Sequence, residues 1–386
     1  MPSTARLPAR STSAPCHPRC ALGRGTADEP LEIDRRLSVA PMMGRTDRHC
    51  RYFLRGFSAR MLLYTEMIAA AELVHGDCAS LLEFDPEEHP VALQLGGCDP
   101  HELAAAARKG EQAGYDEINL NCGCPSDRAT GGVFGAYLMQ RPETVAACVA
   151  AMRAAVRVPV TVKMRIGVID GRGRAAIEAS RRFDEAERAA LHRLVGAVRD
   201  AGCEAVIVHA RKAVLGGLSA QDNREIPPLR YEVVSQLKQA FPELQVVVNG
   251  GLREPRAIVE AFNGLDGLML GREAYQRPTA LARLDALVFR APPTACEPHS
   301  SPEDRDAAAR AHAIERMQRY AERQLARGEK LSAVIRHVQG LYAGEPGARA
   351  FRRILSEGAR RPGAGAEVLA EAAASALSGA SEPDPG

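Results

Sequence analysis

Residues 90–122 read PVALQLGGCDPHELAAAARKGEQAGYDEINLNC, and this stretch predicts one strand–helix–strand unit. Its two ends, residues 90–96 and 116–122, are short apolar runs of the kind that form buried strands. Between them, the Ala- and Glu-rich residues 102–113 predict a helix that Asp99 and Pro100 begin as N-cap and first-turn proline. A strand, a crossover helix and a second strand form a parallel pair, so the stretch indicates an α/β fold.

The same alternation continues in both directions along the chain. Six further strand-like runs are LSVAPM (37–42), MLLYTEMI (61–68), VPVTVKM (158–164), AVIVHA (205–210), QVVVNG (245–250) and DGLMLG (266–271). Eight strand–helix units over about 235 residues match the size of a (β/α)8 TIM barrel, which we therefore predict over residues 37–290. A doubly wound open sheet is the alternative, but six strands would complete it and its Gly-rich turn after the first strand is missing.

The segments outside this barrel differ from it in composition. Residues 1–36 begin with a Pro-, Ser- and Arg-rich stretch without acidic residues up to position 26, which indicates a disordered tail, a start assigned too early or an organellar transit peptide. Residues 300–361 carry strong helix formers at near-helical spacing and predict a small C-terminal helical domain. Residues 362–386 are expected to be a flexible tail beyond one helix. Inside the barrel, the long connection 171–200 predicts an extended loop plus a helix.

The composition excludes several classes of protein. The 386 residues include 50 Lys or Arg and 48 Asp or Glu, a net charge of +2, and 46% are hydrophobic, which is normal for a globular chain. Charges interrupt every apolar stretch well before the ~18 residues of a membrane span, so no membrane association is expected. Ten irregularly spaced cysteines indicate reduced thiols and a cytoplasmic location, or an organellar one if the N-terminus is a transit peptide. A zinc site needs four ligands, and neither the pair Cys16 and Cys20 nor the pair Cys122 and Cys124 supplies enough of them. No metal is therefore expected.

Polar or small residues follow the strands at their C-terminal ends, where a barrel of this kind carries its active site. Burying a polar group without a partner costs free energy, so the convergence of many such groups at one end predicts a ligand. In strand order, the residues at this end are Pro41, Met42, Met43, Gln94, Asn119, Asn121, Cys122, Cys124, Lys163, Arg165, His209, Arg211, Asn249, Gly250, Gly251, Gly271 and Arg272.

Two glycine-containing turns indicate the class of this ligand. Residues 249–251 (Asn-Gly-Gly) and 271–272 (Gly-Arg) follow the last two strands, where barrels bind phosphate with backbone N–H groups and a helix N-terminus. Together with Lys163 and His209 they favour a phosphorylated cofactor over two ordinary turns. Lys163 suits an anionic ring position, and Gln94 can both donate to and accept from a heterocycle. Flavin mononucleotide (FMN) therefore fits better than a sugar phosphate.

The segment Cys122-Gly123-Cys124-Pro125 places two thiols on or next to a strand end. A thiol on a loop shaped by Gly and Pro could protonate or attack a substrate carbon, whereas a buried inert cysteine is the alternative interpretation. Because residues two apart on a strand share a face, the alternation alone does not choose between Cys122 and Cys124.

Several long motifs resemble the A-type tRNA-dihydrouridine synthases. They include VAPMMGRTDRHCRYFLR from Val39, YDEINLNCGCPSDR from Tyr115, HARKAVLGGLSAQDNREIPPLRY from His209, GLMLGREAYQRP from Gly267 and RHVQGLYAGEPGARAFRRIL from Arg336. The similarity covers about residues 37–360. It implies a monomeric flavin enzyme with tightly bound FMN, which uses NADPH to reduce the C5–C6 double bond of uridine in the D-loop of tRNA. The target base must leave its stack for this reaction.

The resemblance also implies roles for single residues. The cysteine before the proline, Cys124, donates the proton to C5, and Cys122 is a spectator. The positions that resemble FMN contacts are Pro41, Met42, Met43, Gln94, Lys163, His209, Asn249, Gly250, Gly251, Gly271 and Arg272. Asn121 resembles the residue that holds the base, and the tRNA-orienting positions are Gln221, Arg224, Arg349 and Arg352, of which Gln221 stands where the family often has Lys.

The near-neutral total charge hides an uneven distribution. Residues 310–361 contain twelve Lys or Arg and five Glu, a local charge of +7, and the rest of the chain is acidic by −5. A basic helical domain next to an active site suits an RNA phosphate backbone. A flavin enzyme acting on a free pyrimidine, of the dihydroorotate dehydrogenase kind, is the alternative that needs no basic domain. A catalytically idle RNA-binding barrel is a further alternative, which needs no intact Cys124 or flavin site.

Overall fold

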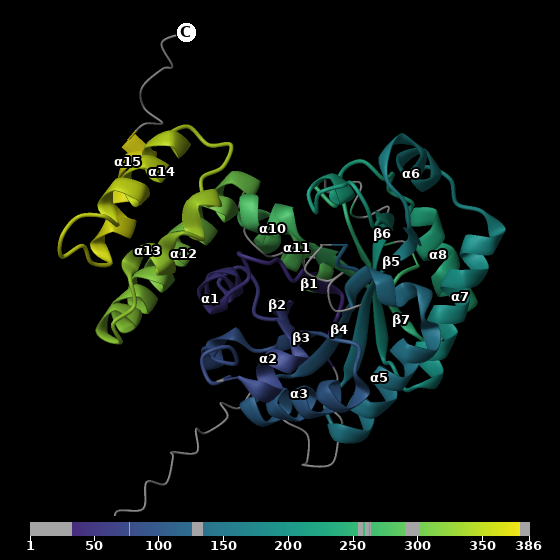
Figure 1. Cartoon of the computed structure of the whole chain (residues 1–386). Helices are drawn as coiled ribbons and strands as arrows, with labels where there is room; N and C mark the ends of the chain where they lie inside the picture. Colours follow the sequence, from purple (N-terminus) through teal and green to yellow (C-terminus); the bar gives the residue numbers. More distant parts are fainter. Residues whose placement is uncertain are drawn as a thin grey trace, which may run out of the picture.

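A computed structural model of the chain describes residues 33–76, 78–125, 134–253, 258, 262, 264–289 and 301–378. Within them, parallel strands close into a barrel in chain order, as Figure 1 shows, and β8 pairs with β1 through Leu37–Leu268 and Val39–Leu270. The predicted (β/α)8 barrel is confirmed, and the open sheet is wrong. The strands are β1 (Leu37–Val39), β2 (Leu62–Ala69), β3 (Val91–Gly96), β4 (Glu117–Cys122), β5 (Val160–Ile169), β6 (Ala205–Val214), β7 (Gln245–Asn249) and β8 (Gly267–Leu270).

Helices lie between the strands and cover the outside of the barrel (Figure 1). Helix α3 (Pro100–Ala113) begins as its sequence predicts, because the Asp99 side chain accepts from the backbone N–H groups of His101 and Glu102. The others around the barrel are α1 (Arg48–Arg55), α2 (Ala70–His75), α5 (Pro142–Ala155), α6 (Gly173–Ser180), α7 (Glu185–Asp200), α8 (Tyr231–Ala240), α10 (Arg272–Gln276) and α11 (Thr279–Phe289), with short 3-10 helices η1 (Pro86–Glu88), η2 (Gly135–Gln140) and η3 (Asp222–Arg224).

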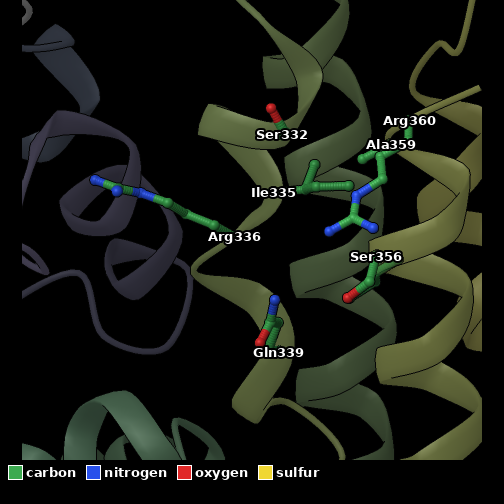
Figure 2. A pocket seen from close by; sticks show the side chains of 8 residues that line it. Ser332, Ile335, Arg336, Gln339, Ser356, Ala359 and Arg360 are labelled. Carbon is green, nitrogen blue, oxygen red and sulfur yellow. The ribbon is translucent and has the colours of Figure 1, made fainter.

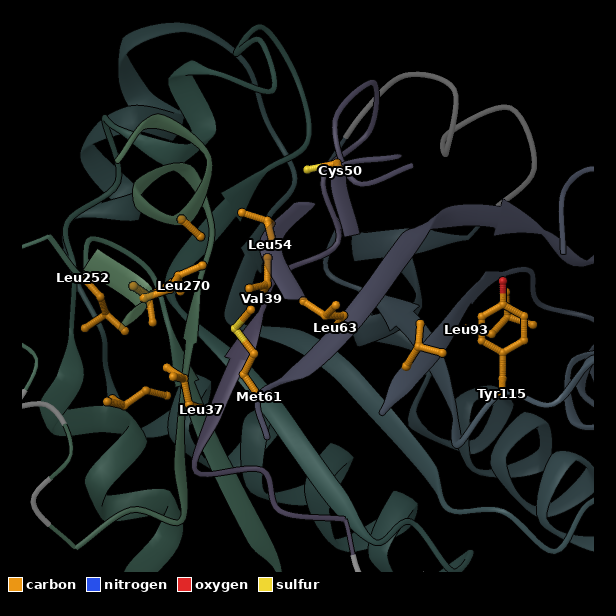
Figure 3. Close-up of a cluster of buried hydrophobic side chains, with 14 of the residues drawn as sticks. Leu37, Val39, Cys50, Leu54, Met61, Leu63, Leu93, Tyr115, Leu252 and Leu270 are labelled. Atoms are coloured by element: carbon orange, nitrogen blue, oxygen red, sulfur yellow. The ribbon is translucent and has the colours of Figure 1, made fainter. Parts of the chain in front are cut away.

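Apolar side chains of strands and helices form the main core. Leu63, Leu93 and Leu270 have no exposed surface, and Figure 3 shows them in a cluster that also contains Met61 and Tyr115. Burial of side chains of this size stabilises the fold by roughly 1.5–3 kcal/mol each. The core therefore holds the strand ends rigidly in place.

The connection between β5 and β6 differs from the predicted extended loop plus helix, because it contains two helices, α6 and α7. The two strands are also longer than predicted. After a register shift at Arg165 they pair again, with Gly167 opposite Lys212 and Ile169 opposite Val214. Lys212 has only 1% of its side chain exposed, forms an ion pair with Glu187 of α7 and so ties the strand extension to the helices.

The helical domain contains α12 (Pro302–Ala326), α13 (Leu331–Ile335), η4 (Val338–Gly340), α14 (Ala348–Gly358) and α15 (Glu367–Ser378). Residues 362–386 contain the one helix expected there, α15, which packs on α14 and buries Leu369 and Ala372. The close approach requires glycine: a Cβ at Gly358 would lie 2.6 Å from Cγ1 of Val368. The expected N-terminal tail lies outside the described residues up to position 32, whereas Arg35 is buried.

The helical domain contacts the barrel through α12 and α13. Tyr320 stacks on Tyr52 of α1, with 3.9 Å between ring centroids and an interplanar angle of 15°. Ion pairs also join the helical domain to the barrel, among them Arg316–Glu87, Arg323–Asp85, Arg327–Glu83 and Arg336–Asp47. Across the part of the chain that the structure describes, no helix combines the length and apolar character needed to cross a bilayer.

Candidate active site

The two cysteines at the end of β4 have different environments. Cys122 is fully buried, and this burial raises the pKa of its thiol far above the ordinary value, so it stays protonated and unreactive. Cys124 is partly exposed at the C-terminal end of the barrel. The structure thus separates the cysteines in a way that strand alternation could not.

The loop that carries Cys124 is held from two sides. The Oδ1 atom of Asn121 accepts from the backbone N–H groups of Gly123 and Cys124, at 3.1 and 3.0 Å. Arg165 donates from Nε to the carbonyl oxygen of Gly123 at 3.0 Å, and from Nη1 to the carbonyls of Lys212 and Asn223. The cysteine loop is therefore bonded to β4, β5 and the β6–η3 region at once.

Gln94 and Asn121 lie next to one another in the same end of the barrel. The Nδ2 group of Asn121 donates to Oε1 of Gln94 at 2.8 Å, and Nε2 of Gln94 donates to Oδ1 of Asn119 at 2.7 Å. Gln94 is 1% exposed and Asn121 is 8% exposed, so both amides are set in fixed positions at the edge of the barrel interior.

Three cationic or basic groups gather beside the cysteine loop. Lys163 donates to Oδ1 of Asn249 at 3.1 Å, and its burial beside Arg165 lowers its pKa to about 7. Burial lowers the pKa of Arg165 to about 9, and the pKa of His209 lies well below its ordinary value because of burial and these two neighbours. Among the described residues, neither Lys163 nor Arg165 forms an ion pair. The basic side chains gathered here give the site a positive potential that suits an anion.

The Gly-Gly turn after β7 lies so close to neighbouring side chains that only glycine fits there. Gly250 and Gly251 have φ of 114° and 66°, which L side chains rarely adopt. A Cβ at Gly250 would lie 2.8 Å from Nε2 of His209, and one at Gly251 would overlap Leu229. The hydroxyl of Tyr231 donates to the carbonyl oxygen of Gly250 at 2.6 Å and fixes the turn.

The remaining predicted contacts fall into two groups. Near the mouth, Gly271 caps α10 and lies against Met42, and Arg272 forms an ion pair with Glu225 at 2.5 Å. In the loop after β1, Pro41 is partly buried and Met43 is 58% exposed. Gln221 and Arg224 are exposed at η3. The structure does not bring Arg349 and Arg352 to the barrel mouth, because both lie exposed on α14 of the helical domain.

Sequence reasoning missed the polar residues inside the barrel below this site. Glu117 and Thr161 are fully buried and connect through Asn119 to Gln94. The sequence does indicate these two residues, because a glutamate and a threonine interrupt otherwise apolar strands at 116–122 and 158–164. Asn223, which bonds to both the N–H and the carbonyl of Val214, carried no such signal.

Two cavities of the described residues lie away from the barrel mouth. One of about 440 Å³ lies below the barrel, next to Arg35 and Gln245. The other, of about 160 Å³, lies in the helical domain between α13 and α14, and Figure 2 shows Arg360 reaching into it between Ile335 and Ser356. In the described part of the chain, no three His, Cys, Asp or Glu side chains are grouped as metal ligands.

Comparison with known proteins places the chain in a family. The family model described as dihydrouridine synthase (Dus) matches residues 38–378. The chain belongs to the dihydrouridine synthase family. A tRNA-dihydrouridine(20/20a) synthase of Pseudomonas aeruginosa is 50% identical over 329 residues, which cover 85% of this chain and 91% of that protein. The proteins of the same name from Xanthomonas axonopodis pv. citri and Vibrio cholerae are 49% and 47% identical, over 87% and 88% of this chain and 92% and 96% of their own lengths.

The dihydrouridine synthase match includes the helical domain and α15 as well as the barrel, since it ends at residue 378. The resemblance inferred from the motifs is thus confirmed at the level of the family. The segment around Cys124, the Gly250–Gly251 turn and α14 all lie inside the matched residues.

Proposed function

We propose that this dihydrouridine synthase reduces the C5–C6 double bond of uridine in the D-loop of tRNA to 5,6-dihydrouridine, with tightly bound FMN and with NADPH as reductant. The relatives are named for positions 20 and 20a, and we propose the same target positions. The protein acts as a monomer in the cytoplasm. The observation that carries the proposal is a partly exposed cysteine, Cys124, beside the two buried basic side chains of Lys163 and Arg165.

The residues at the barrel mouth fit a flavin nucleotide. Backbone N–H groups of the positive-φ turn at Gly250 and Gly251 would bind the phosphate, and Gly271 and Arg272 would add a second group of donors. Lys163 supplies positive charge for the ring, and Gln94 supplies an amide for the ring edge. When bound, FMN supplies the hydride that adds to C6 of the uracil and is itself resupplied by NADPH.

The protein's own part in the reaction is to hold the base and to give one proton. Asn121 would contact the uracil, while Cys124 on the adjoining loop would donate a proton to C5. Arg165 and Asn121 keep the loop fixed by their bonds to Gly123 and Cys124. Cys122 takes no part, because it is buried and its pKa is raised.

The tRNA contacts lie on two surfaces. Gln221 and Arg224 are exposed at the barrel mouth and meet the backbone near the extruded base. Arg349 and Arg352 on α14 meet a more distant part of the same tRNA.

The test is the pair Cys124→Ala and Cys122→Ala, assayed with tRNA from a strain that lacks dihydrouridine synthases. We expect both proteins to be yellow, and we expect Cys124→Ala to lose dihydrouridine formation by about 100-fold or more, as for removal of a general acid. Cys122→Ala should stay within about threefold of the wild type, since it changes only core packing. Dihydrouridine is measured by mass spectrometry of digested tRNA, which also gives its position.

A colourless wild-type protein, or full activity of Cys124→Ala, would contradict the proposal. Turnover of free uridine or of another free pyrimidine at a rate comparable to tRNA would instead support an enzyme of the dihydroorotate dehydrogenase kind.

A further inference from the structure

A continuous chain of side-chain hydrogen bonds runs through the inside of the barrel up to the cysteine loop. The interior of a (β/α)8 barrel is usually filled with branched apolar side chains. Here Glu117, Asn119 and Thr161 have no exposed surface and Gln94 has 1%. Because each polar group in such a place must be satisfied, the order of donors and acceptors along the chain is constrained.

The lower end of the chain is a carboxylate that accepts from three sides. Arg35 forms a buried ion pair with Glu117, and its Nε donates to Oε2 at 2.7 Å. Tyr64 donates to Oε1 at 2.6 Å, and burial together with the Glu117 charge raises the pKa of Tyr64 well above its ordinary value, so that it keeps its proton. The hydroxyl of Thr161 donates to the same Oε1 at 2.6 Å. Glu117 is thus only an acceptor.

This acceptor sets the direction of the next two bonds. Thr161 has one hydroxyl hydrogen, which Glu117 occupies, so its oxygen must face a donor, and Nδ2 of Asn119 donates to it at 2.8 Å. With its Nδ2 turned to Thr161, Asn119 presents Oδ1 on the other side. Nε2 of Gln94 donates to that oxygen at 2.7 Å.

The same direction continues to the cysteine loop. Since Gln94 has its Nε2 on Asn119, its Oε1 accepts from Nδ2 of Asn121 at 2.8 Å. Asn121 then has its Oδ1 towards the backbone N–H groups of Gly123 and Cys124. These N–H groups can only donate, so the upper end requires the same orientation that Glu117 imposes from below.

We propose that Glu117 and Thr161 are positioning residues, which through Asn119 orient the amides of Gln94 and Asn121 and thereby the Cys124 loop. If the chain of bonds is interrupted at Thr161, Nδ2 of Asn119 loses its acceptor, and only the two backbone N–H groups at the upper end still fix the orientation of the amides. The amides and the loop are then held from one side only. The loop would then move away from its position.

The orientation also has a consequence for substrate choice, and this step rests on the proposed function. With its Oδ1 held by the loop, Asn121 has only an N–H left to offer to a ligand. An N–H matches a uracil carbonyl and repels the amino group that cytosine carries at C4. The buried carboxylate would therefore help to select uridine over cytidine, although it lies below the site and does not contact the base.

The test compares Thr161→Val with Thr161→Ser. Valine has nearly the shape of threonine but no hydroxyl, whereas serine keeps the hydroxyl. In flavin-free protein, iodoacetamide labelling of Cys124 is followed by peptide mass spectrometry, with the partly exposed Cys78 as internal reference. We expect Cys124 of Thr161→Val to be labelled about tenfold faster, the effect of one lost buried hydrogen bond, and Thr161→Ser to match the wild type.

In the flavin-loaded protein, Thr161→Val should be reduced by NADPH at the wild-type rate but should transfer its electrons to tRNA about tenfold more slowly, again with rescue by serine. Tyr64→Phe is the stability control, because it removes a donor to Glu117 without interrupting the chain between Glu117 and Asn121. It should leave Cys124 labelling unchanged even if the melting temperature falls.

Equal labelling of Cys124 in Thr161→Val and Thr161→Ser would overturn the inference, as would faster labelling in Tyr64→Phe. The labelling result does not depend on any activity. If labelling follows the expected pattern and no dihydrouridine forms, the proposed function fails while the positioning chain stands.

Discussion

Lys163 is a residue of the site whose charge changes as the pH passes through neutrality. Burial and the nearby Arg165 lower its pKa from an ordinary 10.5 to about 7 in the folded protein. The unfolded chain therefore binds one more proton than the folded chain between these two values. It follows that the contribution of Lys163 to stability improves as the pH rises from 7 towards 10, and is poorest below 7.

This dependence can be isolated by comparison of the wild type with Lys163→Met and Lys163→Arg in flavin-free form. Relative to the methionine variant, we expect the melting temperature of the wild type to rise by about 2 °C or more between pH 7 and pH 9.5. The arginine variant keeps its charge over this range and should show no such gain. Parallel melting curves for all three proteins across the pH range would show that Lys163 is not buried in the way described.

Some residues of the site could be predicted from the sequence, and others could not. The position of Cys124 next to a proline at a strand end could be predicted, because strand ends in a barrel converge. The difference between Cys124 and Cys122 could not, since it depends on which side of β4 faces the neighbouring helices. Glu117 was visible as a charge in an apolar strand, but its partners Arg35 and Thr161 come from other strands or strand-flanking segments far away in sequence.

The Gly-Gly turn after β7 is an element in which the backbone conformation and the close neighbours both require glycine. Alanine at Gly250 would meet two costs, the positive φ and the overlap of its Cβ with the buried His209. Gly264 supplies a matched control, because its φ is 78° and no atom lies within 4 Å of a Cβ built there.

We expect Gly264→Ala to lose about 1 kcal/mol in the free energy of unfolding and to keep its flavin, since only backbone strain is added. Gly250→Ala should lose roughly 2–3 kcal/mol and most of its bound flavin, because the displaced His209 enters the proposed phosphate region. Urea denaturation and the ratio of flavin to protein absorbance measure the two effects. Retention of flavin by Gly250→Ala at the level of Gly264→Ala would argue against a cofactor at this turn.

At the level of elements, the barrel was predictable because buried parallel strands are short continuous apolar runs, such as VALQLG in β3. Two features of the elements could not be predicted, for physical reasons. The extensions of β5 and β6 contain charged residues such as Lys212, whose burial depends on a partner in α7. One helix was expected within residues 362–386 and is α15, but its packing against α14 at Gly358 could not be predicted from its own small-residue sequence.

For the whole molecule, the structure changes the meaning of the basic charge in the helical domain. Several of the arginines counted in residues 310–361 form ion pairs with acidic residues of the barrel side, among them Arg316, Arg323, Arg327 and Arg336. These charges hold the two domains together and contribute less to the field that RNA would meet. Among the basic side chains of residues 310–361 in the described structure, Arg349, Arg352, Arg360 and Lys330 form no ion pair, so most of the positive surface available to a phosphate backbone lies on and just after α14.

The two groups of arginines should therefore respond differently to mutation. We expect Arg349→Ala and Arg352→Ala each to weaken tRNA binding and to lower the slope of log Kd against log salt concentration by about one, without a change in melting temperature, because each removes one phosphate contact. Arg316→Ala should instead lower the melting temperature and leave that slope unchanged, since Arg316 lies 4.1 Å from the Tyr52 ring centroid and pairs with Glu87 at the domain contact. Filter binding at a series of salt concentrations and thermal unfolding separate the two behaviours. An unchanged salt slope in the Arg349→Ala and Arg352→Ala double variant would mean that α14 is not the surface that meets tRNA.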